Sequence, residues 1–332
     1  MKITVLGSGG WGTALALVLL ENGHEVTLWS HDPDKCRRMR QSRENPLLTG
    51  VPLPGALRLE DDLACLSEAE TAVLATPSFA VRTTAAALRG HIRQGTVVVS
   101  VSKGIERDTS LRMSQVIGEE LGGSCPVVVL SGPSHAEEVG RRIPTAVVSA
   151  STDYAAACLV QDLFMNDRFR VYTSSDPVGV EICAALKNVI ALCAGVSDGL
   201  GYGDNTKAML MTRGLAEMCR LGVAMGGKAE TFAGLAGVGD LIVTCTSMHS
   251  RNRRCGILIG QGMPVEQAVE EIGAVVEGYY AAQTARTLAE KAGVEMPITE
   301  AAYQVLYHGK DVRSVVGELM GRRKRDELEE GS

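Results

Sequence analysis

The chain has 332 residues, of which 45% are apolar, only 4% are aromatic and 37 are glycine. With about 100–200 residues in a typical domain, this length predicts two domains, and the composition predicts aliphatic cores with many tight turns. The formal net charge of −6 opposes general binding to nucleic acid or to an anionic membrane, so an anionic ligand must be held by local groups.

The nine cysteines include no CxxC pair, and several lie in apolar runs. This pattern is typical of reduced thiols in a cytosolic protein rather than of a disulfide framework. The sequence passes from Met1 directly into an apolar run, without the charged leader and cleavage site of an export signal. We therefore expect a cytoplasmic protein.

A glycine-rich turn follows the first predicted strand, Lys2–Gly7, and leads into a predicted helix over Thr13–Asn22. Gly7 permits the tight turn, Gly9 lets the backbone approach a pyrophosphate, and Gly12 allows the helix to pack on the strand. The helix N-terminus itself attracts an anion. Since strand, glycine turn, helix and a second strand follow in the order of a Rossmann unit, the pattern predicts dinucleotide binding rather than a structural turn alone.

The second predicted strand, Glu25–Trp29, ends without the carboxylate that NAD-selective enzymes usually place against the ribose 2′-hydroxyl. Beyond it come Ser30, His31 and Asp32, and then Lys35, Arg37 and Arg38. A 2′-phosphate would meet His31 and these bases, so NADP and NAD are both admissible as the cofactor. A solvated helix face is the alternative explanation for each base taken singly.

Further strand-like runs alternate with helical patterns through the first half of the chain. Such alternation predicts an α/β domain with a doubly wound, mostly parallel sheet. The expected later strands are Ala72–Thr76, Thr96–Ser102, Pro126–Ser131, Thr145–Ser149 and Phe169–Thr173.

Two polar segments follow these strands at the carboxyl edge of the predicted sheet, where ligands bind in such folds. Lys103 comes directly after Thr96–Ser102, and Gly132-Pro133-Ser134 comes directly after Pro126–Ser131. They offer an ammonium group, backbone donors and a hydroxyl to a ligand, although either segment would also suit an ordinary surface loop.

After Asp176-Pro177 the β-branched runs almost disappear, and helical patterns follow one another. This change predicts a dinucleotide-binding Rossmann-type domain over 1–179, an all-α C-terminal substrate and catalytic domain over 180–320, and a charged tail over 321–332. The first helical stretch is nearly long enough to span a membrane, but Glu181 and Lys187 favour a buried central helix. The expected helices are 177–197, 205–223, 264–272, 278–292 and 297–307.

Lys187 lies on an apolar face of the first of these helices, because the positions three, four and seven residues away all carry apolar side chains. Such a lysine either extends to solvent or occupies a desolvated cleft, where its pKa falls and it becomes a usable general acid or base. The pattern leaves both possibilities open.

Ser250-Arg251-Asn252 combines a hydroxyl, a guanidinium and an amide within three residues, downstream of Gly237-Val238-Gly239-Asp240. This combination suits the capture of a phosphate, and a solvated basic turn is the alternative. His135 and His249 are the histidines close to these motifs, and they lack the spacing of paired metal ligands, so no metal is predicted.

Together these segments resemble the NAD(P)-dependent glycerol-3-phosphate dehydrogenase family in its bacterial form. Ala184, Cys193 and Gly10 depart from the family pattern, and Gly10 stands where relatives often carry a serine. The resemblance extends from Gly7 to about Pro297 in an ordered set of motifs: Ser102-Lys103-Gly104, Gly132-Pro133-Ser134, Leu186-Lys187-Asn188-Val189-Ile190-Ala191, Gly195-Val196-Ser197-Asp198-Gly199-Leu200-Gly201, Gly203-Asp204-Asn205, Gly237-Val238-Gly239-Asp240-Leu241, Ser250-Arg251-Asn252 and Val275-Val276-Glu277-Gly278.

The resemblance implies Lys187 as the catalytic proton donor and acceptor. Lys103 is the second catalytic candidate. Its positive charge beside Lys187 would lower the pKa of Lys187 and would stabilise an oxyanion. Besides Gly7, Gly9 and Gly12 of the glycine turn, the resemblance places around the cofactor Gly10, Trp11, His31, Lys103, Ala136, Arg251, Val275 and Glu277. It places around the substrate Lys103, Gly132, Ser134, Lys187, Asp240, Ser250, Arg251 and Asn252.

The expected reaction is the NAD(P)-dependent interconversion of glycerone phosphate and sn-glycerol 3-phosphate, which supplies glycerol 3-phosphate for glycerophospholipid synthesis. The expected partners are these small molecules, without nucleic acid or membrane insertion, and the family suggests a homodimer. Two alternatives remain. A β-hydroxyacid dehydrogenase of similar architecture gives no reason for Ser250-Arg251-Asn252, and a non-catalytic NAD(P) sensor would bind the cofactor without turnover.

Overall fold

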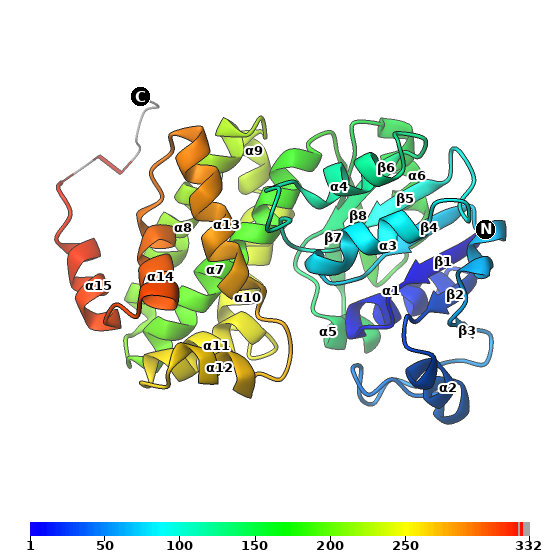
Figure 1. The fold of residues 1–332 in the computed structure, drawn as a ribbon, viewed down its shortest axis with the longest axis horizontal. Coiled ribbons are helices and arrows are strands. Elements are labelled where there is room, and N and C mark those ends of the chain that lie inside the picture. Colours follow the sequence, from blue (N-terminus) through cyan, green and yellow to red (C-terminus); the bar gives the residue numbers. More distant parts are fainter. Residues whose placement is uncertain (325, 328–332) are drawn as a thin grey trace.

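The computed structural model describes residues 1–324, 326 and 327. A β-sheet with its covering helices forms one part of the molecule and a block of helices forms the other (Figure 1). Between them lies helix α7 (Pro177–Gly199), whose first turns pack against the sheet and whose later turns form the centre of the helical block. Of the predicted tail, residues 325 and 328–332 lie outside the described residues.

Eight strands form one sheet in the order β3-β2-β1-β4-β5-β6-β7-β8. Neighbouring strands are parallel except for β6 and β7, as expected for a mostly parallel sheet. The strand order reverses between β1 and β4, which opens a crevice at their carboxyl ends. The strands are β1 (Lys2–Leu6), β2 (Glu25–Trp29), β3 (Arg58–Glu60), β4 (Thr71–Leu74), β5 (Val97–Ser100), β6 (Val127–Ser131), β7 (Thr145–Ala150) and β8 (Phe169–Ser174).

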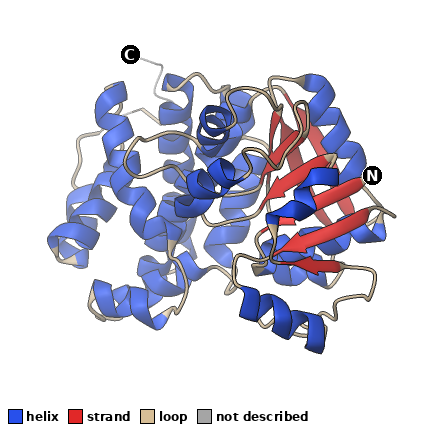
Figure 2. Ribbon diagram, turned by 45° about the vertical axis from the view of Figure 1, so that its right-hand side comes forward, coloured by secondary structure: helices blue, strands red, loops and turns tan. Residues whose placement is uncertain are grey.

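Helices cover both faces of this sheet (Figure 2). Because successive side chains of a strand point to opposite faces, Ile3 and Val5 enter one core while Leu6 enters the other. The first core contains α1 (Gly10–Glu21), α2 (Pro33–Ser42), α5 (Ala136–Gly140) and α6 (Tyr154–Phe164). The second contains the 3₁₀ segment Leu63–Glu68, α3 (Val81–Ala87) and α4 (Met113–Glu120).

The helical block surrounds α7. By length and composition α7 is, within the described residues, the one single helix that would qualify as a membrane span, but 89% of its most apolar window is buried inside the protein, as predicted for a central helix. The helices around it are α8 (Asp204–Ala224), α9 (Ala229–Phe232), α10 (Asp240–Thr246), α11 (Arg251–Gly260), α12 (Val265–Glu271), α13 (Glu277–Ala292), α14 (Pro297–His308) and α15 (Val312–Met320).

Helices α7 and α11 lie so close that their backbones touch. A Cβ atom at Gly195 would collide with the Arg253 carbonyl, and one at Gly256 would collide with the Leu192 carbonyl. Glycine at these crossings therefore sets how near α11 comes to the apolar face of α7.

Several predicted elements differ from the observed ones. Strand β3 was not predicted, because it has three residues and a single apolar one. The helix predicted from Thr13 begins earlier, at Gly10. The run Ser250-Arg251-Asn252, for which a solvated basic turn was the alternative, lies at the start of helix α11, because the Ser250 hydroxyl accepts a hydrogen bond from the Arg253 N–H (3.2 Å) and so caps that helix.

Candidate active site

Two lysines and one aspartate meet where the carboxyl edge of the sheet faces α7 and α10. The Lys187 Nζ atom donates to Asp240 Oδ1 (2.7 Å) and to the hydroxyl of Thr244 (2.8 Å). The Lys103 Nζ atom donates to Asp240 Oδ2 (2.8 Å) and to the Gly132 carbonyl (2.9 Å). The Asp240 carboxylate thus bridges the two lysines, one on each oxygen.

Local structure explains how these groups reach one another. Lys103 leaves the sheet after β5, and Gly132 leaves it after the neighbouring strand β6. Gly132 has φ +153° and its Cα approaches β7 so closely that a Cβ would lie 2.9 Å from the Val147 Cα. Only glycine suits that conformation. Asp240 and Thr244 lie one turn apart on α10, so both face α7.

Burial dominates the electrostatics of this bridge. The Lys187 side chain is 6% exposed, so it occupies a desolvated site and does not extend to solvent. Burial and the like charge of Lys103 together lower the pKa of Lys187 to about 8, against the opposing effect of Asp240. Burial also tends to raise the pKa of Asp240, but Lys103 and Lys187 outweigh it and hold that pKa below its usual range.

The other residues expected around the substrate lie close by but differ in what they offer. The Ser134 hydroxyl donates to the Gly132 carbonyl (2.9 Å). Asn252 is buried and has two partners, since its amide donates to Asn188 Oδ1 (3.0 Å) and its oxygen accepts from the Gly278 N–H (2.8 Å). Of the predicted phosphate-binding run, Arg251 alone is exposed.

The glycine turn between β1 and α1 leaves room for a ligand. Gly7 has φ +118°, and a Cβ on Gly12 would collide with the Gly7 carbonyl, so both positions require glycine. A Cβ on Gly9 would meet nothing within 4 Å, which leaves open space above the turn. Helix α1 has no side-chain cap, so its first N–H groups stay available to an anion.

Gly10 has a steric role in this chain. A Cβ there would lie 2.5 Å from the Leu47 carbonyl and 3.6 Å from the Ala136 Cβ. The absence of a side chain therefore lets the segment after α2 approach the turn, and it brings Ala136 beside it. Trp11 is half-buried next to the same turn.

The remaining residues expected around the cofactor lie at two places. His31 is exposed just after β2. Glu277 is the first residue of α13. Both its carboxylate oxygens accept a hydrogen bond from the Ser78 hydroxyl (3.0 and 2.9 Å), and burial raises the pKa of Glu277. The charge of Arg251 acts on Glu277, and Val275 is half-buried shortly before it.

Sequence reasoning missed three polar residues of this region. Thr244 contacts Lys187 and stands four residues after Asp240, a spacing that marks a shared helix face. Ser78 follows β4, so the rule that placed Lys103 at the sheet edge would also have found it. Asn188 had no such signal, because its contact with Asn252 spans 64 residues of sequence.

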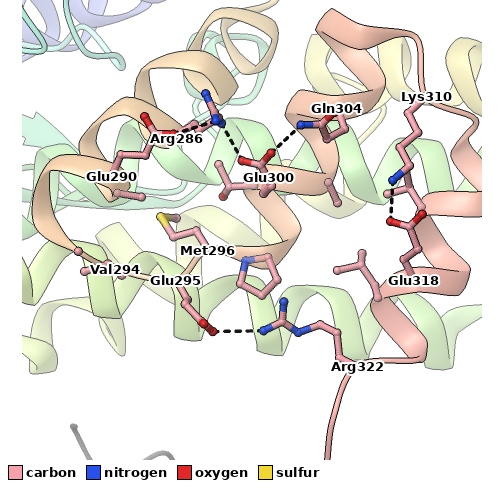
Figure 3. Close-up of a pocket in the computed structure, with 17 residues that line it drawn as sticks. Arg286, Glu290, Val294, Glu295, Met296, Glu300, Gln304, Lys310, Glu318 and Arg322 are labelled. Carbon is pink, nitrogen blue, oxygen red and sulfur yellow. Dashed lines mark hydrogen bonds and ion pairs between the residues drawn. The ribbon is translucent and has the colours of Figure 1, made fainter.

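A cleft of about 700 Å³ lies elsewhere, between α13, α14 and α15 (Figure 3). Its charged side chains already pair with one another: Arg286 with Glu290 and Glu300, Lys310 with Glu318, and Arg322 with Glu295. None of its lining residues belongs to the set predicted for the cofactor or the substrate. Among the described residues, no cluster of three or more His, Cys, Asp or Glu side chains could hold a metal ion.

A glycine turn for a dinucleotide on the sheet, together with a buried lysine from the helical part, defines a nucleotide-dependent oxidoreductase built from two parts. The N-terminal pattern of NAD-dependent glycerol-3-phosphate dehydrogenase matches residues 2–157, and the C-terminal pattern matches residues 176–317. The chain belongs to this family, which confirms the resemblance and the predicted fold class.

Individual relatives match over nearly the whole chain. A glycerol-3-phosphate dehydrogenase (NAD(P)+) from Desulfitobacterium hafniense is 55% identical over 330 residues, covering 99% of this chain and 94% of the relative. One from Moorella thermoacetica is 54% identical over 332 residues, covering 99% and 98%. The crystal structure of glycerol-3-phosphate dehydrogenase from Coxiella burnetii has a TM-score of 0.93 at 40% identity, covering 97% of this chain and 99% of that one.

Proposed function

We propose that the chain catalyses the NAD(P)-dependent interconversion of glycerone phosphate and sn-glycerol 3-phosphate and so supplies glycerol 3-phosphate for glycerophospholipid synthesis. The observation that carries this proposal is the buried bridge Lys187–Asp240–Lys103 at the carboxyl edge of a dinucleotide-binding sheet. The family of the chain supports the same reaction.

The cofactor residues fit a dinucleotide, because Gly9 leaves open space and the start of α1 is uncapped. NAD(P), when bound, supplies the hydride for reduction of the ketone and accepts it in the reverse reaction. The residues that would hold it are Gly7, Gly9, Gly10, Trp11, Gly12, His31, Lys103, Ala136, Arg251, Val275 and Glu277.

Lys187 handles the proton. In the reductive direction its ammonium group donates a proton to the alkoxide that develops at C2, and in the oxidative direction the neutral amine accepts the proton from the C2 hydroxyl. A pKa of about 8 makes both forms accessible near neutral pH. Lys103 places a second positive charge near that oxygen, and Asp240 holds the two ammonium groups together.

The substrate phosphate pairs with Arg251, the exposed cation at the start of α11. Gly132, Ser134, Ser250 and Asn252 complete the substrate pocket. Binding of the phosphate, remote from C2, would fix the orientation of the carbonyl toward Lys187.

The same proposal covers the domain organisation, the oligomeric state and the cellular location. Residues 1–179 form the dinucleotide-binding unit, residues 180–320 the substrate and catalytic unit, and residues 321–332 a charged tail. The enzyme acts as a homodimer in the cytoplasm.

The test is the loss of NADPH or NADH absorbance on adding glycerone phosphate, compared with unphosphorylated glycerone. Arg251→Ala should raise the KM for glycerone phosphate roughly tenfold to a hundredfold, because a charge-assisted hydrogen bond is worth about 1.5–3 kcal/mol. Arg254→Ala, which removes another exposed arginine three residues further along α11, is the control. Reduction of a β-keto acid but not of glycerone phosphate would favour a β-hydroxyacid dehydrogenase, and cofactor binding without any turnover would favour a sensor.

A further inference from the structure

Lys35, in the first turn of α2, reaches back to the glycine turn. Its Nζ atom donates to the Ser8 carbonyl (2.5 Å), although the two residues lie 27 positions apart. Ser8 stands between Gly7 and Gly9, so this ammonium group lies at the edge of the candidate dinucleotide site. The sequence offered Lys35 only as one of several bases near a 2′-phosphate, and the site residues named above do not include it.

The acid nearest to this point is committed elsewhere. Oδ1 of Asp32 accepts the backbone N–H groups of Asp34 (2.9 Å) and Lys35 (3.0 Å), which makes Asp32 the N-cap of α2. One oxygen of this carboxylate is therefore engaged with its own helix. The side chain that faces the glycine turn from the end of β2 is instead Ser30, whose hydroxyl accepts a hydrogen bond from the Ser8 hydroxyl (2.9 Å).

The ammonium group of Lys35 also has N–H donors that this contact does not use. An ammonium group has three N–H bonds, and one of them goes to the Ser8 carbonyl. That carbonyl also accepts from the Asn45 amide (3.0 Å), so it would stay bonded if Lys35 turned toward a ligand.

Two other cations of α2 have carboxylate partners, and the third, Arg38, is exposed. Arg37 pairs with Asp34 (3.0 Å), and Arg40 pairs with Glu60 (2.8 Å). Within the described part of the chain, Lys35 has no carboxylate at ion-pair distance, although the side chain is half-buried. Burial lowers its pKa, which indicates a positive charge with less compensation than it would have in water.

We propose that Lys35 binds the 2′-phosphate of NADPH and makes the chain bind NADPH more tightly than NADH. NADH has only a hydroxyl at that position and gains nothing from the ammonium group. His31 is exposed at the same end of β2 and stays among the residues that would hold the cofactor. The inference rests on cofactor binding at the glycine turn and is independent of which carbonyl compound is reduced.

Equilibrium titration without substrate tests this role. Trp11 and Trp29 are the two tryptophans of the chain and both adjoin this region, so quenching of their fluorescence reports binding. Titrations with NADPH and with NADH are compared for wild type, Lys35→Gln, Lys35→Arg and the control Arg40→Gln. We expect wild type to bind NADPH more tightly and Lys35→Gln to weaken NADPH binding tenfold to a hundredfold, with NADH binding changed less than twofold.

Lys35→Arg should restore most of the NADPH affinity, and Arg40→Gln should change neither titration. Equal weakening of both cofactors by Lys35→Gln would overturn the inference, because it would show that Lys35 only supports the turn through the Ser8 carbonyl. Unchanged NADPH binding would overturn it too. Failure of wild type to bind either cofactor would refute the proposed function as well, whereas selective loss of NADPH binding supports the inference even if glycerone phosphate proves not to be the substrate.

Discussion

At the scale of single residues, Lys187 shows how a charged group is kept inside an apolar helix. Its side chain is 6% exposed, and its ammonium group has two partners, Asp240 and Thr244. The partners hold it in one place, while burial brings its pKa down to about 8. A lysine poised in this way suits proton transfer near neutral pH.

Lys187→Met should lower turnover roughly 10²–10⁴-fold, the usual contribution of a positioned acid or base. Stability should stay near that of wild type, because methionine fills similar volume and Asp240 keeps its bond to Lys103. Cofactor affinity, measured by titration, should change little. Lys291→Met, an exposed change at the end of α13, is the control. A folded Lys187→Met enzyme that retains more than a tenth of wild-type turnover would contradict the proposed proton transfer.

The pH profile should follow the protonation of Lys187. Reduction requires the ammonium form, so kcat/KM for reduction should be level below about pH 8 and fall above it, while oxidation should show the opposite trend. Asp240 raises the pKa of Lys187, so Asp240→Asn should lower that pKa and move the fall to lower pH. Steady-state rates between pH 6 and pH 10 (roughly two units to either side of the expected midpoint) check this. A shift to higher pH in Asp240→Asn would show that another group titrates.

At the scale of elements, glycine spacing decides where α11 lies against α7. Gly195 and Gly256 each meet a carbonyl of the opposite helix. On the same two helices, the Asn252 amide donates to Asn188 Oδ1, next in sequence to Lys187. Helix packing and site geometry are therefore set by the same residues.

Gly195→Ala should destabilise the protein by about 1–3 kcal/mol, because the added methyl group forces two packed backbones apart. Gly118→Ala is the matched control, since Gly118 lies within α4 with open space around its Cα. The control should stabilise by about 0.5–1 kcal/mol through helix propensity. Urea unfolding measures both changes. Equal effects of the two substitutions would mean that close packing at Gly195 is not what requires glycine there.

The elements themselves follow sequence pattern to differing degrees. Strands such as Val127–Ser131 and the long helix α7 were predicted because their apolar runs are long and regular. Helices α10 and α11 were not predicted, because they are short and begin at glycine and serine, which also favour turns. Their helical form depends on burial against α7, which local pattern does not reveal.

At the scale of the whole molecule, a buried carboxylate joins the sheet part to the helical part. Glu181 on α7 accepts from the Arg112 guanidinium (2.5 Å) and from the Ser114 N–H (2.7 Å) and hydroxyl (2.6 Å) at the start of α4. Burial raises its pKa, so the charge of Glu181 depends on these donors.

Arg112→Met should destabilise the protein by about 3 kcal/mol, near the lower end of the range for breaking a buried ion pair. The cost is moderated because Ser114 still donates to Glu181 and the carboxyl group can take up a proton. Arg112→Met with Glu181→Gln should recover part of the loss, since no buried charge then lacks its partner. Urea unfolding of the two single variants and the double variant gives the coupling energy. Strict additivity would mean that the pair does not join the two parts.

The sequence alone determined the dinucleotide turn, the mostly parallel sheet and the apolar helix around Lys187. Each of these depends on the spacing of residues that are neighbours in the chain, and local spacing fixes which face of a strand or helix is apolar. It also singled out the lysines, but it left open whether Lys187 is buried or reaches solvent.

The tertiary structure decided how those residues are used. Asp240 joins Lys187 and Lys103 across 53 and 137 positions of sequence, and Lys35 meets Ser8 across 27. The same packing engages Asn252 with Asn188 and leaves Arg251 exposed. Burial, and with it the pKa of each group, arises only when distant segments exclude water together, so no local pattern could have specified it.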